Sequence, residues 1–225
     1  MHRYKSRLFL ILFLLLGPVV LRAQGDELKV GLRAGHNAAF GGFAALSVET
    51  AQSFCRNFSV EGGIQYNTIG KTTVEALPAY HMPFGWGRLS VESVLAYTNL
   101  SSVNSFAAGA GAAVDSRGVS AKFGYYYRFY GGKGDKITEP FNIYYELRVH
   151  CLKKLEKWKL DLVLTTCGMF ELERHYQPSF IAEGCFYPSS RLGITFGIGC
   201  KPSGMFNMSA DYYQSYLNTG VCYRW

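Results

Sequence analysis

Residues 141–150 read Phe-Asn-Ile-Tyr-Tyr-Glu-Leu-Arg-Val-His, a stretch in which apolar and polar side chains alternate. The odd positions from Phe141 to Val149 are apolar or aromatic, and the even positions from Asn142 to His150 are polar or amphipathic. Because a β-strand places successive side chains on opposite faces, this period of two predicts a strand with one apolar face and one polar face. The same alternation recurs over residues 119–130 and 192–199.

About twelve segments of the chain show this pattern, with turn signals such as Gly41-Gly42 and Pro188-Ser189-Ser190 between several of them. The predicted strands are 28–37, 43–51, 57–67, 88–98, 105–115, 119–130, 140–151, 158–171, 178–187, 191–201, 205–213 and 216–225. No apolar run of about 18 residues follows residue 23, so the sequence predicts no transmembrane helix there. The chain is therefore expected to be all-β.

The composition agrees with a β-sheet protein. Charged residues are 17% of the 225 residues and aromatic residues 16%, and there are 25 glycines. So few charges with so many aromatic residues argue against a disordered chain and against a helical bundle.

The N-terminus has the features of a secretory signal peptide. Basic residues precede an apolar core at 8–16, and the small residue Ala23 follows, so we expect cleavage after Ala23. An uncleaved anchor helix is the alternative. The predicted signal holds four of the 23 basic residues and none of the 16 acidic ones, so its removal lowers the net charge from +7 to +3. The remaining charge is spread along the chain, and we expect no binding of nucleic acid. The predicted domains are a signal peptide at 1–23 and one β-domain at 24–225.

Charged residues fall on one face of the predicted strands, which distinguishes two architectures. A soluble sandwich would bury its apolar face and would usually carry more Lys and Glu outside. A membrane barrel instead turns an uncharged face to lipid, where Arg or Lys near the midplane costs about 2–4 kcal/mol. Aromatic residues near strand ends on the apolar face suit the two membrane interfaces. We therefore predict a closed up-and-down antiparallel transmembrane β-barrel of about 12 strands, with ten as the alternative.

The last eight residues are Asn-Thr-Gly-Val-Cys-Tyr-Arg-Trp. Asn218, Gly220, Tyr223 and Trp225 resemble the C-terminal signal of bacterial outer-membrane β-barrel proteins, although Phe is commoner than Trp at the last position. The resemblance implies a location in the outer membrane of a Gram-negative bacterium, in contact with its lipid. It also implies recognition of the last strand by the barrel-assembly machinery. It identifies no subfamily, and the oligomeric state stays open.

The polar face of a 12-strand barrel describes its lumen, which is wider than that of an eight-strand barrel. The candidate lumen network mixes acids and bases: Glu61, Glu92, Lys122, Arg128, Glu146, Arg148, Lys159 and Asp161. A turn near Lys154 would place Arg148 opposite Asp161 and His150 opposite Lys159. The mixture of signs favours a small, weakly selective channel or transport barrel of porin type over a one-sign ion filter. A plugged, purely structural interior is the alternative.

The longest predicted loop, 68–87, falls after the third strand and is expected to face the outside. Its Tyr80, His81, Phe84 and Trp86 are candidate contact residues for a surface or periplasmic partner, and the loop is the sequence support for a binding scaffold. An ordinary surface loop is the simpler interpretation. By the same count the turn at 131–139 would lie on the periplasmic side, although periplasmic turns are usually short.

A lipid-modifying enzyme is a further alternative, but the sequence shows no compact Ser–His motif. His36 and Ser93 both fall on the lipid-facing side, on strands that are not neighbours, so no catalytic residue is predicted. Six cysteines are scattered, and strand geometry favours free thiols over a disulfide framework. By parity Cys151 and Cys200 face lipid, and Cys167, Cys185 and Cys222 face inward. No clustered metal ligands occur, so neither a metal nor a cofactor is expected.

Overall fold

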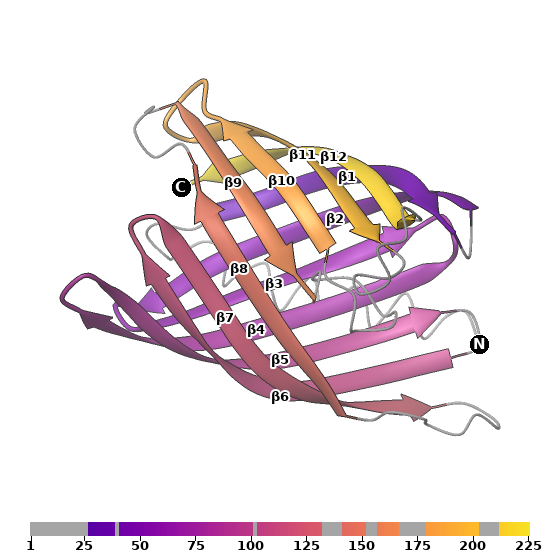
Figure 1. The fold of residues 1–225 in the computed structure, drawn as a ribbon, viewed down its shortest axis with the longest axis horizontal. Coiled ribbons are helices and arrows are strands. Elements are labelled where there is room, and N and C mark those ends of the chain that lie inside the picture. The colour runs from indigo at the N-terminus through magenta and orange to yellow at the C-terminus, as the bar shows by residue number, and fades with distance from the viewer. Residues whose placement is uncertain are drawn as a thin grey trace.

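The computed structural model describes residues 27–38, 41–100, 103–131, 141–151, 157–166, 179–202 and 212–225. Within this part of the chain, twelve antiparallel strands close into one barrel (Figure 1). The strands are β1 (Glu27–Asn37), β2 (Gly41–Cys55), β3 (Phe58–Asn67), β4 (Lys71–Phe84), β5 (Gly87–Leu100), β6 (Val103–Ser116), β7 (Val119–Gly131), β8 (Phe141–His150), β9 (Trp158–Thr165), β10 (Ser179–Phe186), β11 (Leu192–Pro202) and β12 (Tyr212–Arg224).

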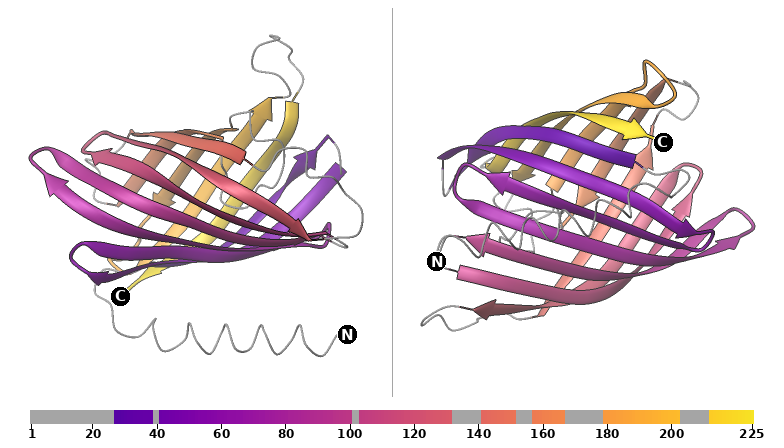
Figure 2. Two further views of the ribbon diagram at one scale, coloured as in Figure 1. Left: turned by 90° about the horizontal axis from the view of Figure 1, so that it is seen from below. Right: turned by 180° about the vertical axis from the view of Figure 1, so that it is seen from behind.

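Each strand pairs with its neighbours in the sequence, and the first strand pairs with the last. β1 and β12 are joined along their whole length, from Glu27 opposite Arg224 to Asn37 opposite Gln214. Figure 2 shows β12 in yellow beside β1 in indigo. The predicted fold class, an all-β up-and-down antiparallel barrel of 12 strands, is confirmed. Among the described residues, no helix is long and apolar enough to cross a membrane.

The barrel wall has the sidedness that the alternation predicts. Along β7 and β8 the apolar residues at odd positions are mostly exposed on the outside, and the residues between them are covered. Phe123, Leu162 and Leu217 are examples of large apolar side chains on the outer wall. In a soluble protein such a continuous apolar exterior would be unfavourable, whereas hydrocarbon solvates it.

Two predicted segments need correction. The predicted loop 68–87 is mostly strand β4, which the sequence analysis missed because Pro78 and Pro83 interrupt its strand signal. The ladder between β4 and β5 has no pairs at Leu77 and Pro78, where proline lacks a backbone donor. The predicted strand 205–213 lies almost entirely outside the described residues, and β12 begins at Tyr212. The predicted signal peptide lies outside them as well.

The even number of strands puts Glu27 and Arg224 at one end of the barrel, the terminal end. The three longest connections, 132–140, 167–178 and 203–211, all join strands at the opposite end. Outer-membrane barrels have short periplasmic turns and longer extracellular loops. By this pattern the terminal end is the periplasmic one. The end of β7 at Gly131 and the start of β8 at Phe141 therefore lie at the extracellular end, which corrects the predicted periplasmic turn at 131–139.

The predicted register between β8 and β9 is wrong by two residues. His150 lies opposite Asp161, and Arg148 lies opposite Val163 rather than Asp161. Lys159 lies opposite Cys185 of β10 rather than His150. The pairing between the two strands is centred one residue later in the chain than the turn near Lys154 predicted from the sequence. A shift of two residues leaves each side chain on its predicted face, so the charges still point inward.

Candidate functional site in the barrel lumen

The lumen contains two adjoining cavities of about 940 Å³ and 570 Å³. The larger lies toward the periplasmic end, where Trp158 and Ser189 line it. Seven of the eight residues predicted as the lumen network line both cavities: Glu61, Glu92, Lys122, Glu146, Arg148, Lys159 and Asp161. The eighth, Arg128, lines the smaller cavity alone. The charges therefore surround the zone where the two cavities meet.

The acidic and basic side chains that line the two cavities are equal in number. Nine acidic side chains line them: Glu27, Glu49, Glu61, Glu75, Glu92, Asp115, Glu146, Asp161 and Glu183. Nine basic side chains line them as well: Lys29, Arg33, Arg88, Lys122, Arg128, Arg148, Lys157, Lys159 and Arg224. Such an interior presents a passing ion with both acidic and basic side chains, whereas an ion-selective filter presents a ring of charges of one sign.

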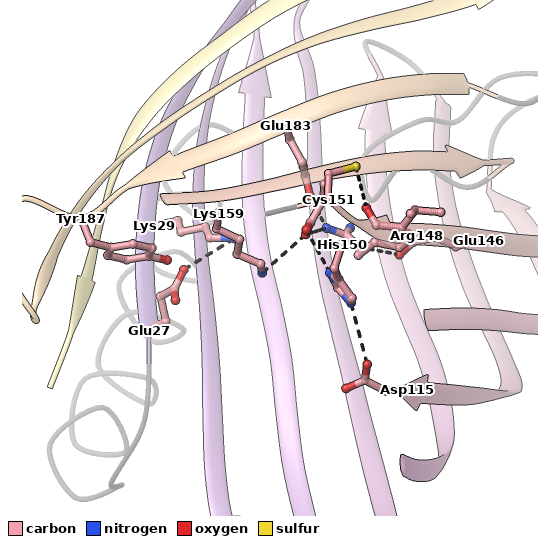
Figure 3. A network of polar contacts seen from close by, with 12 residues as sticks. Glu27, Lys29, Asp115, Glu146, Arg148, His150, Cys151, Lys159, Glu183 and Tyr187 are labelled. Atoms are coloured by element: carbon pink, nitrogen blue, oxygen red, sulfur yellow. Dashed lines mark hydrogen bonds and ion pairs between the residues drawn. The ribbon is translucent and has the colours of Figure 1, made fainter. Parts of the chain in front are cut away.

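Arg148 of β8 is the centre of the largest network of charges (Figure 3). Its Nε lies 3.2 Å from Glu146 Oε1 and its Nη1 lies 3.2 Å from Asp161 Oδ2. The same Nη1 pairs with Glu183 of β10. One guanidinium thus holds three carboxylates from three adjacent strands, and its rigid fork of N–H donors suits this arrangement.

Asp161 is the most buried carboxylate of the network and has several partners. Besides Arg148, its carboxylate oxygens contact His150 Nδ1 at 2.9 Å and Lys159 Nζ at 3.5 Å. The other imidazole nitrogen of His150 faces Asp115 at 3.9 Å (Figure 3). A buried carboxylate requires such compensation, because an unpaired charge away from water is costly.

A second group of charges lies beside the first, on strands β5 to β8. Glu92 of β5 receives a hydrogen bond from the Tyr144 hydroxyl at 2.8 Å and an ion pair from Lys122 at 3.0 Å. Tyr144 belongs to β8, and its ring crosses β7 and β6 over Gly124 and Gly111. A Cβ at Gly124 would lie 2.5 Å from that ring, so only glycine lets the tyrosine lie flat against the wall. The ring therefore reaches Glu92 without filling the centre of the lumen.

Three cations are stacked on aromatic rings that line the interior. The guanidinium carbon of Arg33 lies 4.3 Å from the Tyr216 ring centre, and that of Arg128 lies 5.4 Å from the Tyr126 ring centre. At the periplasmic end, Arg224 lies 4.0 Å from the ring centre of Tyr187 and also pairs with Glu27 at 2.8 Å. Stacking fixes a guanidinium in place while leaving its charge facing the lumen.

The lumen also contains a Ser–His cluster that the sequence analysis did not find. His81 Nε2 lies 2.7 Å from Ser59 Oγ, and His81 Nδ1 lies 2.7 Å from Ser90 Oγ. The three residues come from β3, β4 and β5, and no short motif in the sequence links them. The alternation of side chains along β4 is the signal that could have placed His81 inside the barrel. It was not used, because the segment was predicted to be a loop.

The predicted contact residues of the loop 68–87 do not form a loop surface. Tyr80 points outward from β4, whereas His81 points into the lumen. Phe84 ends β4 and Trp86 lies in the following turn, with their rings 4.7 Å apart at the periplasmic end. The turn is therefore on the side opposite to the predicted one, because the missed strand reverses the direction of the chain. The exposed rings suit the periplasmic edge of the membrane.

The four residues of the predicted assembly signal lie in or directly after β12. Asn218 and Gly220 face the interior, and Tyr223 faces outward. Trp225 stacks near Tyr223 with a ring separation of 6.0 Å. Their recognition by the assembly machinery stays a prediction.

Neither a catalytic pair nor a metal centre is formed by the residues that the sequence singled out. His36 and Ser93 lie on β1 and β5, which are not neighbours in the barrel. Within the described ranges, no three His, Cys, Asp or Glu side chains are grouped to hold a metal ion. Cys151 and Cys200 are exposed and Cys185 and Cys222 are buried, as their parity predicts, and Cys167 lies outside the described residues.

The sequence matches no known protein family and no curated protein. The barrel is similar to several solved structures. The KdgM porin, solved in complex with disordered oligogalacturonate, has a TM-score of 0.61 at 10% identity, over 88% of this chain and 99% of that one. The NanC porin has a TM-score of 0.59 at 9% identity, over 89% of this chain and 100% of that one.

The translocator domain of the autotransporter NalP from Neisseria meningitidis has a TM-score of 0.56 at 12% identity, over 99% of this chain and 96% of that one. Identities this low establish the fold alone. A closed barrel is the form in which strands cross a bilayer, since it leaves no backbone group unpaired in hydrocarbon. Together with its apolar outer wall, the fold makes this chain an integral β-barrel of the bacterial outer-membrane type.

Proposed function

We propose that this chain forms a small, water-filled channel through the outer membrane, with a charge-balanced zone of weak ion selectivity inside it. The observation that carries the proposal is the placement of seven predicted network residues around the junction of the two cavities. Solutes that move from one cavity to the other pass these side chains. Ion pairs such as Lys122 with Glu92 and Arg148 with Asp161 hold six of the seven, so these side chains line the wall without collapsing into the passage.

The flattened tyrosines support a passage rather than a filled interior. Tyr144 lies along Gly124 and Gly111, and Tyr216 lies over Gly199 in the same manner. Both rings cover the wall, whereas side chains at those glycine positions would push them toward the axis. The barrel therefore keeps its bulky inner residues at the periphery.

The alternatives have less support. A lipid-modifying enzyme would need its nucleophile accessible from the membrane, whereas Ser59, His81 and Ser90 lie on the lumen side of their strands. We assign this cluster to the polar lining of the channel. A binding scaffold built on the segment 68–87 loses its basis, because that segment is a strand.

The test is permeation of neutral solutes into liposomes that contain the purified, folded protein. We expect swelling in isotonic sugar solutions at rates that fall as the sugar becomes larger. Short oligosaccharides belong in the series, because the similar KdgM porin was solved with oligogalacturonate. The same protein boiled before reconstitution is the control. Swelling no faster than in protein-free liposomes would refute the channel.

A further inference from the structure

Two thiols meet inside the barrel near its periplasmic end. Cys185 belongs to β10 and Cys222 to β12, and their Sγ atoms lie 3.6 Å apart. Both side chains are buried, and Cys222 is completely so. Cys185 lines the smaller lumen cavity, so a small ion in the lumen reaches the pair from that side.

Gly193 of β11 provides the space for this contact. Strand β11 lies between β10 and β12, and Gly193 lies directly opposite Cys222 in the register. A Cβ at position 193 would lie 2.8 Å from Cys185 Sγ and nearer still to Cys222 Sγ. Real Cβ atoms do not come that close to other heavy atoms, so any other residue would separate the thiols. The missing side chain therefore lets two non-adjacent strands place their sulfur atoms together over β11.

The fold prevents the two thiols from forming a disulfide with each other. Neighbouring strands lie about 4.7–4.9 Å apart, so strands on either side of a third are about 9–10 Å apart. A disulfide joins residues whose Cα atoms are at most about 7 Å apart. The pair therefore stays a dithiol even though the barrel is exposed to the oxidising periplasm. Two thiols that stay reduced are available as ligands.

The sulfur separation matches that of two thiolates bound to one tetrahedral metal ion. Bonds of about 2.3 Å at the tetrahedral angle put two sulfur ligands about 3.8 Å apart. The observed 3.6 Å is within about 0.2 Å of that value. An ion bound linearly between the sulfur atoms would need them about 4.6 Å apart, twice the bond length. The spacing therefore fits a tetrahedral, thiophilic ion such as Zn²⁺ without movement of the strands.

The groups around the pair suit thiolate ligands. The Tyr187 hydroxyl donates a hydrogen bond to Cys185 Sγ, and Arg224 in turn donates a hydrogen bond to the Tyr187 oxygen. Hydrogen bonds of this kind orient the ligands of a metal ion. Two thiolates and Zn²⁺ together carry no net charge, so the centre stays buried without a further counter-ion.

We propose that Cys185 and Cys222 bind a thiophilic, tetrahedral metal ion of the Zn²⁺ type, which ties β10 to β12 across β11. Each S–H bond breaks as its sulfur binds the ion, and the proton goes to water, so one bound ion releases two protons. The oxidation state of the metal does not change. Water from the smaller cavity fills the remaining positions, as in zinc sites with an open coordination position. The site does not depend on conduction through the passage.

The experiment uses the protein purified from outer membranes in detergent. The protein is stripped of metal with a chelator and incubated with Zn²⁺, free ion is removed, and the bound zinc is measured by elemental mass spectrometry. We expect one Zn²⁺ per barrel and slower alkylation of Cys185 by N-ethylmaleimide when the ion is bound. Co²⁺ in place of Zn²⁺ reports the geometry. We expect its sulfur-to-cobalt charge-transfer band and the strong visible absorption of tetrahedral Co²⁺.

Matched variants separate this site from adventitious binding. Cys222→Ser removes one sulfur with little change in volume and should abolish both the bound Zn²⁺ and the Co²⁺ charge-transfer band. Cys200→Ser removes an exposed thiol of β11 and should leave both unchanged. Gly193→Ala should abolish binding, because its methyl group separates the sulfur atoms. Gly197→Ala places a methyl group against Asn218 on the same strand and should keep binding.

Each sample is also run unheated and boiled on a gel to establish that the barrel is folded. Wild-type protein whose band shifts on boiling but which binds no Zn²⁺ would overturn the site alone. The same zinc content in folded Cys222→Ser and wild type would also overturn it, because the ion would then be held elsewhere. A missing band shift in the wild type would overturn the membrane barrel and the site with it.

Discussion

Replacing Arg148 with methionine removes the cation that holds three carboxylates together on the inner wall. Asp161 has a side chain only 3% exposed, whereas those of Glu146 and Glu183 are 25% and 36% exposed. Removing one partner of a buried ion pair costs about 3–5 kcal/mol, because the remaining charge is left uncompensated. Asp161 keeps His150 and Lys159, and the two glutamates are partly solvated, which screens them. We therefore expect Arg148→Met to lower the free energy of unfolding by about 3 kcal/mol, the low end of that range.

The assay is urea unfolding of the barrel reconstituted in lipid vesicles, followed by the loss of the heat-modifiable band. With a slope of about 2 kcal/mol per M, the midpoint should fall by about 1.5 M. The control is Lys159→Met, which removes the same charge from the same network. Lys159 is 53% exposed and 3.5 Å from Asp161, so its loss should cost less than about 1 kcal/mol.

A second substitution identifies the cause of the loss. If the unpaired, buried carboxylate of Asp161 destabilises the variant, adding Asp161→Asn to Arg148→Met should restore most of the midpoint. An unchanged midpoint in Arg148→Met, or a loss as large in Lys159→Met, would show that Arg148 does not compensate the buried carboxylate.

Three further experiments test other parts of the wall. Glu61→Gln and Arg33→Gln should shift the cation-to-anion permeability ratio in opposite directions, each by about twofold. The reason is that one charge about 6 Å from an ion contributes about 0.4 kcal/mol after screening. Reversal potentials in a salt gradient measure the ratio. A shift in the same direction would contradict this. Tyr144→Phe should lower the free energy of unfolding by about 1.5–3 kcal/mol in the urea assay, because it removes the hydrogen bond to Glu92; no change would show that the bond contributes nothing. Phe123→Lys on the outer wall should cost about 2–4 kcal/mol in the same assay, whereas Ser120→Lys on the lumen side of β7 should be tolerated. Equal costs would contradict the assigned faces.

The sidedness of the wall could be predicted from sequence because it depends on one local property. The alternation from Phe141 to His150 indicates which side chains face lipid and which face the lumen. It does not depend on which residues of the neighbouring strands lie opposite. For the same reason the eight network residues could be placed inside before any register was known. The error of two residues between β8 and β9 changed the residue opposite Arg148 from Asp161 to Val163 but left the face of Arg148 unchanged.

Other features depend on contacts that no local pattern contains. β4 was missed because its lumen face carries Leu77 and Ala79, so apolar residues occur on both faces and two prolines interrupt it. The predicted total of twelve strands was nevertheless right, because the prediction counted a strand at 205–213 in place of the missed strand β4. The approach of Cys185 to Cys222 depends on a glycine of a third strand. Such contacts appear only when several strands are aligned.

The proposed channel requires that the ionised faces of the strands enclose an open aqueous passage. Single-channel recording of the purified barrel in planar bilayers detects such a passage. We expect discrete conductance steps and a reversal potential close to zero across a potassium chloride gradient. Electrically silent but folded protein, or a reversal potential near the limit for a single ion species, would contradict it.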